Sequence, residues 1–411
     1  MKIQIRIWCM RKSQFIENCN AWAEEGTSFL FMIDYELEQF LIFRPEEAAG
    51  QGIFYNINGR TNYSGAGVGI SRKQMSESGR GTGAGAPQGG RNGVLPGLSV
   101  EPGPGSRDAE PPDMWATAPP KFRFEAVPMA FPRYEKAFSL VKKHILHGNS
   151  FLLNLTFPTP VETDLGLEQI FHASAAPYRL LFGDRFVVFS PETFVTIGGN
   201  TIRSFPMKGT IDAALPDAER RLLENEKELW EHNTIVDLIR NDLSMVAADV
   251  QVARFRYIDR IRTHQGELLQ VSSEIEGRLG SGWRSGLGEL LLRMLPAGSI
   301  SGAPKLKTVE IIAEAEGQKR GFFTGIFGIF DGEAVDSAVM IRYIERVGTG
   351  KDVGNASGKT TGKQASGRKT NRGKANGGLQ FRSGGGITGH SEAAAEYREM
   401  IEKVYVPIVR S

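Results

Sequence analysis

The order of the strand-like segments limits the folds open to this chain more than any other feature. In "FLFMIDYELEQFLIF" two short apolar runs flank "YELEQ", which reads as a turn. Aromatic and β-branched residues are also concentrated in "SFLLNLTF", "RFVVFSPETFVTI" and "DSAVMIRYIER", which we interpret as strands. These segments come in runs, whereas a doubly wound parallel sheet requires strands and helices to alternate. The order of the elements therefore predicts an α+β fold.

Three other segments carry apolar residues at helical spacing. "YEKAFSLVKKHILHGN" predicts a helix that stops at Gly148. The stretch "DAERRLLENEKELWEHNTIVDLIRNDLSMVA" predicts one long amphipathic helix, and "AAAEYREMIEKVYVPI" predicts a final one.

Two glycine-rich stretches differ from the rest of the chain. Residues 63–120 hold few large apolar side chains to offset the entropy lost on ordering, so we expect a disordered linker or insertion there. Residues 347–378 are basic and lie between two strand-like segments, as an overlong hairpin loop would. The two stretches separate an amino-terminal part over 1–62 from a larger region over 121–411, which contains the basic loop.

Charge and cysteine content narrow the class of protein. The 411 residues have a formal net charge of +2, which gives no general argument for a nucleic-acid or membrane partner. No apolar run approaches the ~18 residues needed to cross a bilayer. Cys9 and Cys19 are the only cysteines, and no Cys/His cluster has zinc-site spacing, which suits a reducing cytoplasm. The basic loop lacks aromatic residues for base stacking, so only non-specific nucleic-acid binding stays open as an alternative.

Two pairs of glutamates have the same spacing on predicted helices. Glu228 and Glu231 are three residues apart, as are Glu396 and Glu399, and Lys403 lies one turn beyond the second pair. Side chains at this spacing project from one helix face, and carboxylate oxygens are ligands that Mg²⁺ prefers. The same spacing is common on solvated helix faces, so spacing alone does not make a metal site.

Two glycine clusters, "PAGSISGAPK" and "SGGGITGHS", each precede a helical segment. Glycines let backbone N–H groups approach a ligand, and a helix amino terminus favours anions. Ordinary turn and capping chemistry explains either cluster alone equally well. Neither follows the phosphate-binding order G-x-x-x-x-G-K-[ST].

The lysine in "SFPMKGT", Lys208, stands beside the apolar residues Phe205, Pro206 and Met207. A lysine becomes nucleophilic when desolvation lowers its pKa enough to leave a free amine, and these neighbours could supply desolvation. A structural or solvated lysine in a turn is the alternative.

Taken together, these segments resemble the chorismate-utilising enzymes, which include anthranilate, aminodeoxychorismate, isochorismate and salicylate synthases. The matching blocks, in the family's order, are "SPETF", "PMKGT", "KELWEHNTIVDLIRNDLS", "PAGSISGAPK", "RGFFTGIFGIF", "AVMIRY", "GGGIT" and "EYREMIEKVY". They cover residues 122–407 apart from the basic loop, and residues 1–62 look like the abbreviated first part of short aminodeoxychorismate synthase component I chains. The resemblance implies two antiparallel sheets that sandwich around a substrate cleft and are flanked by helices.

The resemblance also assigns roles to residues. Glu231 and Glu399 match Mg²⁺ ligands, and Glu228 and Glu396 match acidic partners that act through metal-bound water. Glu192 matches the general acid that protonates the departing C4 hydroxyl of chorismate, which requires a raised pKa. The expected carboxylate clamp and cleft lining comprise Arg342, Lys403, Gly385, Gly386, Gly209 and Thr210.

Lys208 separates the subgroups of the family. Aminodeoxychorismate synthases carry lysine where anthranilate synthases usually carry alanine, so Lys208 is the expected nucleophile, attacking C2 of chorismate. Isochorismate and salicylate synthases place a water-activating lysine where this chain has Leu152, which disfavours hydration. Gln270 stands where many relatives have histidine. Ser299 and Ser301 keep the hydroxyls of a block usually written with threonines.

No glutamine amidotransferase segment accompanies these blocks, so the resemblance implies a partner glutaminase subunit that supplies ammonia. The expected product is 4-amino-4-deoxychorismate, on the route to 4-aminobenzoate and folate. Anthranilate synthase component I is the alternative within the family. A catalytically silent member is a further alternative because of Gln270.

Overall fold

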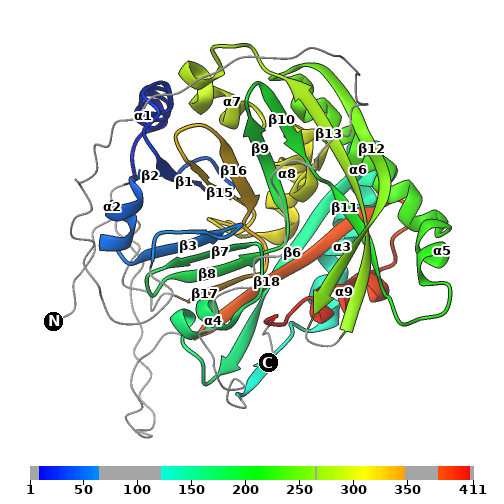
Figure 1. The fold of residues 1–411 in the computed structure, drawn as a ribbon. Coiled ribbons are helices and arrows are strands. Elements are labelled where there is room, and N and C mark those ends of the chain that lie inside the picture. The colour runs from blue at the N-terminus through cyan, green and yellow to red at the C-terminus, as the bar shows by residue number, and fades with distance from the viewer. Residues whose placement is uncertain (1–8, 64–121, 264–265, 348–377, 408–411) are drawn as a thin grey trace, which may run out of the picture. The chain divides into compact units, whose positions relative to one another are not determined.

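A computed structural model describes residues 9–63, 122–263, 266–347 and 378–407 (Figure 1). Within these residues the strands form two sheets of nine strands each, and neighbouring strands pair antiparallel. The predicted α+β class with two antiparallel sheets is confirmed. The predicted linker over 63–120 and the predicted loop over 347–378 lie outside the described residues, apart from Tyr63, Val347 and Gly378.

The sheets are named A and B here. The strands of sheet A, in spatial order, are β11 (Met207–Asp212), β13 (Gly266–Arg278), β10 (Thr201–Ser204), β9 (Thr193–Gly198), β16 (Val335–Val339), β15 (Ile326–Phe330), β1 (Phe29–Ile33) and β2 (Phe40–Phe43), with β12 (Ala248–Thr263) beside β13. The strands of sheet B are β14 (Gly302–Ala303), β6 (Leu152–Thr163), β18 (Leu379–Thr388), β17 (Tyr343–Arg346), β8 (Phe186–Ser190), β7 (Tyr178–Phe182), β3 (Ile53–Ile57) and β4 (Arg60–Thr61), with β5 (Phe124–Ala126) beside β6. The expected hairpins β1–β2 and β17–β18 are both present, the second with Arg346 opposite Leu379.

One apolar cluster joins the two sheets face to face. It combines Leu30 and Phe327 of sheet A with Leu180, Val188 and Tyr343 of sheet B, all of them buried. Strands that are buried on both faces need apolar residues at every position, and β1 reads "FLFMI" for that reason. The hydrophobic effect therefore favours a sandwich over two separate sheets.

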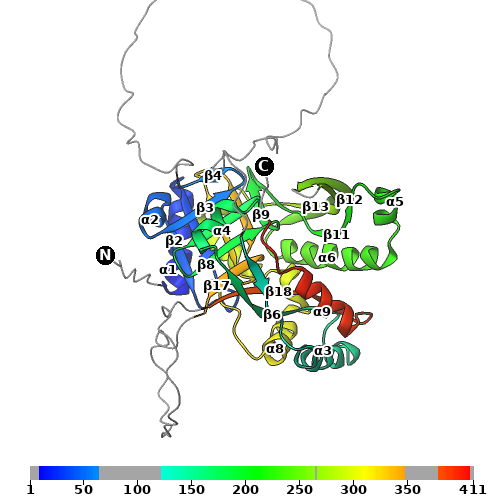
Figure 2. The ribbon, with the colours of Figure 1, turned by 90° about the horizontal axis from the view of Figure 1, so that it is seen from below.

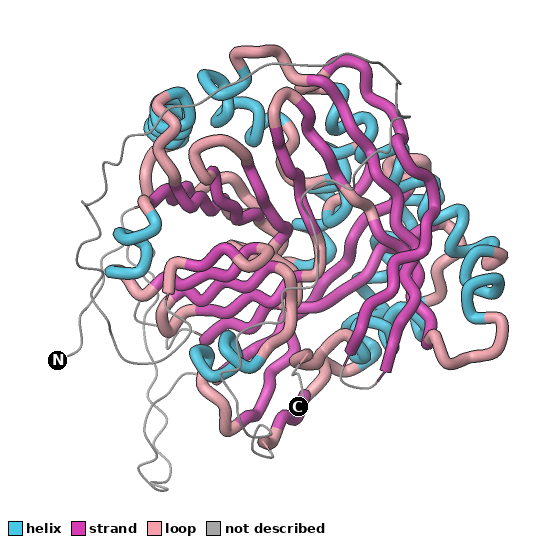
Figure 3. Tube along the Cα trace, viewed as in Figure 1, coloured by secondary structure: helices cyan, strands magenta, loops and turns pink. Residues whose placement is uncertain are grey.

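Helices cover the outer faces of the sheets (Figure 2, Figure 3). A second apolar cluster lies on the outer face of sheet A. The helices that pack there are α1 (Lys12–Glu24), α6 (Glu226–Ser244) and α7 (Leu287–Arg293). The helices that pack on β6 and β18 are α3 (Phe131–Leu146), α8 (Lys305–Glu316) and α9 (Ala393–Glu402). The remaining helical segments are α2 (Pro45–Gly50), α4 (Leu167–Ala173), α5 (Ala218–Leu223) and the 3₁₀ turns η1 (Trp283–Gly286) and η2 (Gly298–Ile300). No helix within the described part of the chain combines the length and the apolar character that a membrane span requires.

Two segments that we interpreted as single strands each divide between the sheets. "RFVVFSPETFVTI" forms β8 in sheet B and β9 in sheet A, because Pro191 has no N–H to continue a ladder. "DSAVMIRYIER" forms β16 in sheet A and β17 in sheet B, with Arg342 between them at a φ of 53°. The two crossings lie side by side, since Val339 donates its N–H to the Glu192 carbonyl at 3.2 Å.

The predicted single long helix is also wrong, because it breaks at Asn225 into α5 and α6. The Asn225 side chain accepts a hydrogen bond from the backbone N–H of Glu228 at 3.1 Å. Asparagine followed three residues later by glutamate is a sequence signature of a helix start. The prediction of a helix that stops at Gly148 is confirmed, with α3 ending at Leu146 and Gly148 at a φ of 76°.

Candidate active site

The two glutamate pairs occupy equivalent places on α6 and α9. Glu228 and Glu396 lie in the first turn of their helices, and Glu231 and Glu399 follow one turn later. The positive end of a helix dipole stabilises carboxylates at this position. Both pairs therefore lie near helix amino termini.

Lys208 projects from a bulge in β11. The pairing of β11 with β13 shifts register between Lys208 and Thr210, and Gly209 between them has a φ of 76°. A Cβ on Gly209 would lie 3.3 Å from Oε2 of Glu228, so the missing side chain lets α6 approach the strand. The bulge brings Nζ of Lys208 to 2.6 Å from Oε2 of Glu231.

The charge state of Lys208 differs from our expectation. Its burial favours a lower pKa, as we predicted, but the carboxylates of Glu231, Glu228 and Glu399 outweigh burial and raise the pKa of Lys208. Lys208 is therefore an ammonium group in this structure. Carboxylates from both α6 and α9 surround it, which brings both predicted pairs to one site.

The glycines of β18 adjoin the second glutamate pair. A Cβ on Gly385 would lie 3.5 Å from carboxylate oxygens of both Glu396 and Glu399. Lys403 places its Nζ 2.6 Å from Oε1 of Glu399 and donates to the Gly384 carbonyl at 2.9 Å. β17 pairs with residues 379–382 of β18, so the described pairing of the glycines is with β6 alone. Gly385 therefore faces the carboxylates of Glu396 and Glu399, and the Gly384 carbonyl faces Lys403.

Arg342 and Glu192 come from the two adjacent sheet crossings. Arg342 donates to the Lys403 carbonyl at 3.1 Å, and its guanidinium lies 5.0 Å from the ring centre of Tyr405. Burial raises the pKa of Glu192, an effect that a hydrogen bond and the charges of Lys403, Lys208 and Arg342 reduce but do not cancel. The site thus combines a carboxyl group with a raised pKa and three cationic side chains.

Ser299 is a site residue whose role the sequence analysis missed. It donates its hydroxyl to Oε1 of Glu192 at 2.5 Å. The sequence showed only that a hydroxyl is retained there, because the two residues are 107 positions apart.

The remaining predicted positions lie at the margins of the site. Thr210 is exposed and pairs in register with Gln270, which donates to the hydroxyl of Ser272 at 3.5 Å. Leu152 is 7% exposed, and its Cδ1 would lie 3.1 Å from a Cβ on Gly386. At position 152 the structure therefore has an apolar side chain beside Gly386.

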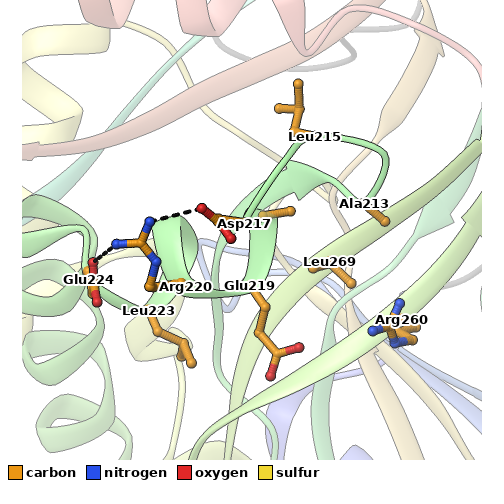
Figure 4. Close-up of a pocket in the computed structure, with 10 residues that line it drawn as sticks. Ala213, Leu215, Asp217, Glu219, Arg220, Leu223, Glu224, Arg260 and Leu269 are labelled. Atoms are coloured by element: carbon orange, nitrogen blue, oxygen red, sulfur yellow. Dashed lines mark hydrogen bonds and ion pairs between the residues drawn. The ribbon is translucent and has the colours of Figure 1, made fainter.

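An open pocket of about 650 Å³ lies elsewhere, between α5 and the β12–β13 hairpin (Figure 4). Its two arginines are already paired: Arg220 with Asp217 at 3.0 Å, and Arg260 with Glu267 at 3.0 Å. None of the predicted site residues lines this pocket. We therefore assign the candidate site to the region around Lys208, Glu192 and the glutamate pairs.

Comparison with known proteins agrees with this geometry. The family described as chorismate binding enzyme matches residues 6–358 of the chain. The chain belongs to the chorismate-binding enzyme family. The resemblance drawn from the eight sequence blocks is confirmed.

Two named relatives are similar over nearly the whole chain, and a third over about half of it. An uncharacterized PabA-like protein of Haemophilus influenzae is 45% identical, covering 96% of each chain. A second, from Pasteurella multocida, is 42% identical and covers 96% of this chain and 98% of its own. Anthranilate synthase component 1 1 of Haloarcula marismortui is 36% identical over 51% of this chain and 46% of its own.

Solved structures in the family share the fold. Anthranilate synthase component I of Streptococcus pneumoniae aligns with a TM-score of 0.53 at 25% identity, covering 72% of this chain and 61% of its own. The isochorismate synthase MenF of Escherichia coli aligns with a TM-score of 0.58 at 14% identity, covering 95% of this chain and 80% of its own.

The donor chemistry of the site fits Mg²⁺. Nζ of Lys208 lies 2.6 Å from an oxygen of Glu231, and Nζ of Lys403 lies 2.6 Å from an oxygen of Glu399. Each of these carboxylates therefore already contacts a cationic group. Among the described residues no three His, Cys, Asp or Glu side chains converge closely enough to hold an ion. Mg²⁺ needs only one or two carboxylates and fills its other positions with water. Glu231 and Glu399 could supply one carboxylate from each helix.

The bulge at Gly209 leads to a prediction about stability. Gly209→Ala should lower the free energy of unfolding by about 1–3 kcal/mol, because alanine disfavours a φ of 76° and would crowd Leu222 at 3.1 Å and Glu228 at 3.3 Å. Denaturant unfolding measures the loss. Gly199→Ala is the matched control, since its φ is 57° and no atom lies within 4 Å of the added Cβ. Equal losses in the two variants would contradict the crowding.

Proposed function

We propose that this chain is component I of an aminodeoxychorismate synthase. It would replace the C4 hydroxyl of chorismate with an amino group from ammonia and produce 4-amino-4-deoxychorismate. The observation that carries the proposal is the position of Lys208, whose amine lies among the carboxylates of α6 and α9 and close enough to Glu192 to influence its pKa. The names of the PabA-like relatives support the same direction.

The proposed reaction has two displacements. Lys208 first loses its ammonium proton to solvent water, and the free amine then attacks C2 of chorismate. The ring double bond shifts, and the C4–O bond breaks. Glu192 gives its proton to the departing hydroxyl, which leaves as water. Ammonia then bonds to C4, the double bond shifts back, and the C2–N bond to Lys208 breaks. Lys208 leaves as the free amine, and the new ammonium group at C4 returns a proton to Glu192. Chorismate and ammonia have become aminodeoxychorismate and water.

Other residues of the site hold the substrate in this proposal. Arg342 and Lys403 pair with a carboxylate of chorismate, since both are cationic and connected by a 3.1 Å hydrogen bond. Gly385 and Gly386 line the substrate site beside β18 in this proposal, and a Cβ on Gly385 would lie 3.5 Å from carboxylate oxygens of Glu396 and Glu399.

Magnesium, when bound by Glu231 and Glu399, would supply positive charge that neutralises these carboxylates and binds the C1 carboxylate of chorismate. Glu228 and Glu396 would orient the water around it. Glu231 would then be shared between the metal and Lys208, whose Nζ lies 2.6 Å from its Oε2.

Competition for Glu231 leads to a prediction about metal affinity. Lys208→Met should bind Mg²⁺ about tenfold more tightly than the wild type, because it removes a cation that lies 2.6 Å from Glu231. Titration calorimetry measures the affinity without any turnover. Lys208→Arg keeps the charge and should bind Mg²⁺ as the wild type does. Unchanged affinity in the methionine variant would contradict competition at Glu231.

The ammonia in this proposal comes from a partner glutamine amidotransferase subunit or from free ammonium. The proposed reaction belongs to the biosynthesis of 4-aminobenzoate and folate. We propose no membrane partner and no specific nucleic-acid partner. The net charge of +2 and the lack of aromatic residues in the basic loop support both statements.

Anthranilate synthase is the second candidate function. Named anthranilate synthases match 51–66% of this chain at 31–36% identity. Lys208 argues against it, because an amine at this point of the site would compete with ammonia for C2 of chorismate.

Incubation with chorismate, Mg²⁺ and ammonium, followed by mass spectrometry of the products, tests the proposed function. The expected product is 4-amino-4-deoxychorismate without release of pyruvate. Anthranilate with pyruvate would support the second candidate. Unchanged chorismate, in the presence of a glutaminase partner as well, would reject both.

A further inference from the structure

A buried ion pair joins the end of α6 to the start of α8. Asp242 lies 2.7 Å from Nζ of Lys305, and the two side chains are 11% and 18% exposed. Removing one partner of such a pair leaves an uncompensated charge in a poorly solvated place. The pair is therefore a fixed connection between the two helices.

The pair also holds the turn over residues 294–304, which joins α7 to α8. The second carboxylate oxygen of Asp242 accepts the backbone N–H of Gly298 at 3.0 Å, and Lys305 donates to the Met294 carbonyl at 2.8 Å. A Cβ on Gly298 would come within 2.8 Å of both Asp242 and Leu238, so the turn lies directly against α6. Both ends of the turn are thus attached to one ion pair.

The residue after Gly298 is Ser299, the hydrogen-bond donor to Glu192. Glu192, Asp242, Gly298 and Ser299 all line one cavity of about 20 Å³, which is the size of a single water molecule. A continuous set of contacts therefore runs from Asp242 through the turn to the carboxyl group of Glu192.

We propose that Asp242 and Lys305 are positioning residues that fix the hydroxyl of Ser299 on Glu192. The inference rests on the proposed function, in which Glu192 is the acid. Neither residue touches the substrate, and their effect passes through the turn. The charged groups that face Glu192 directly are Lys208, Lys403 and Arg342, and none of them contacts the ion pair in the described structure.

The test compares the pKa of Glu192 among variants of the full chain. Loss of the Ser299 hydrogen bond should raise this pKa by about one pH unit, because that bond favours the charged form. Asp242→Asn and Lys305→Met should therefore both raise it. A pure charge effect would instead have opposite signs, since removing an anion lowers the pKa of a nearby carboxyl and removing a cation raises it.

Unfolding experiments give this pKa without reference to activity. The unfolding free energy of each variant is measured from pH 4 to pH 9, with and without the additional substitution Glu192→Gln. The difference between the two curves follows the titration of Glu192. Ser299→Ala should give the same shift, and Asp242→Asn should add nothing to it. Lys307→Met is the control, because Lys307 forms an exposed pair with Glu310 on the same helix and should leave the pKa unchanged.

Kinetics provide the second readout. The alkaline limb of chorismate consumption should move upward with the pKa, while KM for chorismate changes less than twofold. Shifts of opposite sign, or no shift, would overturn the inference even if aminodeoxychorismate is the product. If the wild type makes anthranilate instead, the proposed function fails, but the pKa comparison still decides the role of the pair.

Discussion

Lys208→Met should reduce the amination of chorismate by about a thousandfold or more, because it removes the group that forms the covalent intermediate in the proposed reaction. Lys208 extends from the bulge of β11 into the carboxylates of α6 and α9, and ammonia alone would have to reach C4 without prior activation of the ring. Product formation by mass spectrometry under saturating chorismate and ammonium measures the loss. The wild type, but not the variant, should yield a lysine adduct when the reaction is quenched with acid.

Lys208→Arg separates the nucleophile from the charge at this position. Arginine keeps a cation beside Glu231 but does not lose its proton in proteins, so it should be as inactive as methionine. An arginine variant with more than a few per cent of wild-type activity would mean that Lys208 acts through its charge. In that case the covalent step would have to be abandoned.

Glu192→Gln should lower kcat by about 10²–10⁴-fold, because glutamine keeps the shape and can still accept the Ser299 hydrogen bond but cannot donate a proton. KM for chorismate should change little. In the wild type, activity should fall as the pH rises through the raised pKa of Glu192, since only the protonated carboxyl is an acid. A glutamine variant with wild-type kcat would exclude Glu192 as the acid.

The same substitution should make the protein more stable at neutral pH. The pKa of Glu192 is higher in the folded protein than in the unfolded chain, where it is about 4.3. The folded protein therefore loses stability as the pH rises from that value through the folded pKa. The variant lacks this penalty, so its unfolding free energy should exceed that of the wild type at pH 8 and approach it below pH 4. Ser299→Ala, which leaves the carboxyl in place, should not show the gain.

Local sequence patterns were sufficient for much of the fold and part of the site. The i, i+3 spacing placed Glu228 with Glu231 and Glu396 with Glu399, because helical geometry fixes such neighbours. The ordered motif blocks indicated the family and hence the two sheets. The start of α6 was also readable from Asn225 and Glu228, although we interpreted the segment as one helix.

Contacts between distant segments could not be read from the sequence. The bond from Ser299 to Glu192 joins two turns that are 107 positions apart in the sequence and meet only in the folded protein. The charge of Lys208 likewise depends on Glu231 and Glu399, which come from two different helices. The apolar neighbours of Lys208 in sequence suggested only desolvation, which lowers its pKa. The carboxylates that raise the pKa instead belong to helices distant in sequence.

The side-by-side crossings between the sheets make some spacings in the site rigid and leave others adjustable. Phe189 donates its N–H to the Arg342 carbonyl at 3.1 Å, and Val339 donates to the Glu192 carbonyl. Glu192 and Arg342 are therefore held at the same junction between the two sheets. Lys208 belongs to the far edge of sheet A, and Lys403 follows the helix that covers sheet B. If one sheet slid over the other, the distance between Glu192 and Arg342 would therefore be preserved. The distance between Lys208 and the glutamates of α9 would change, so this distance reports how closely the two sheets pack.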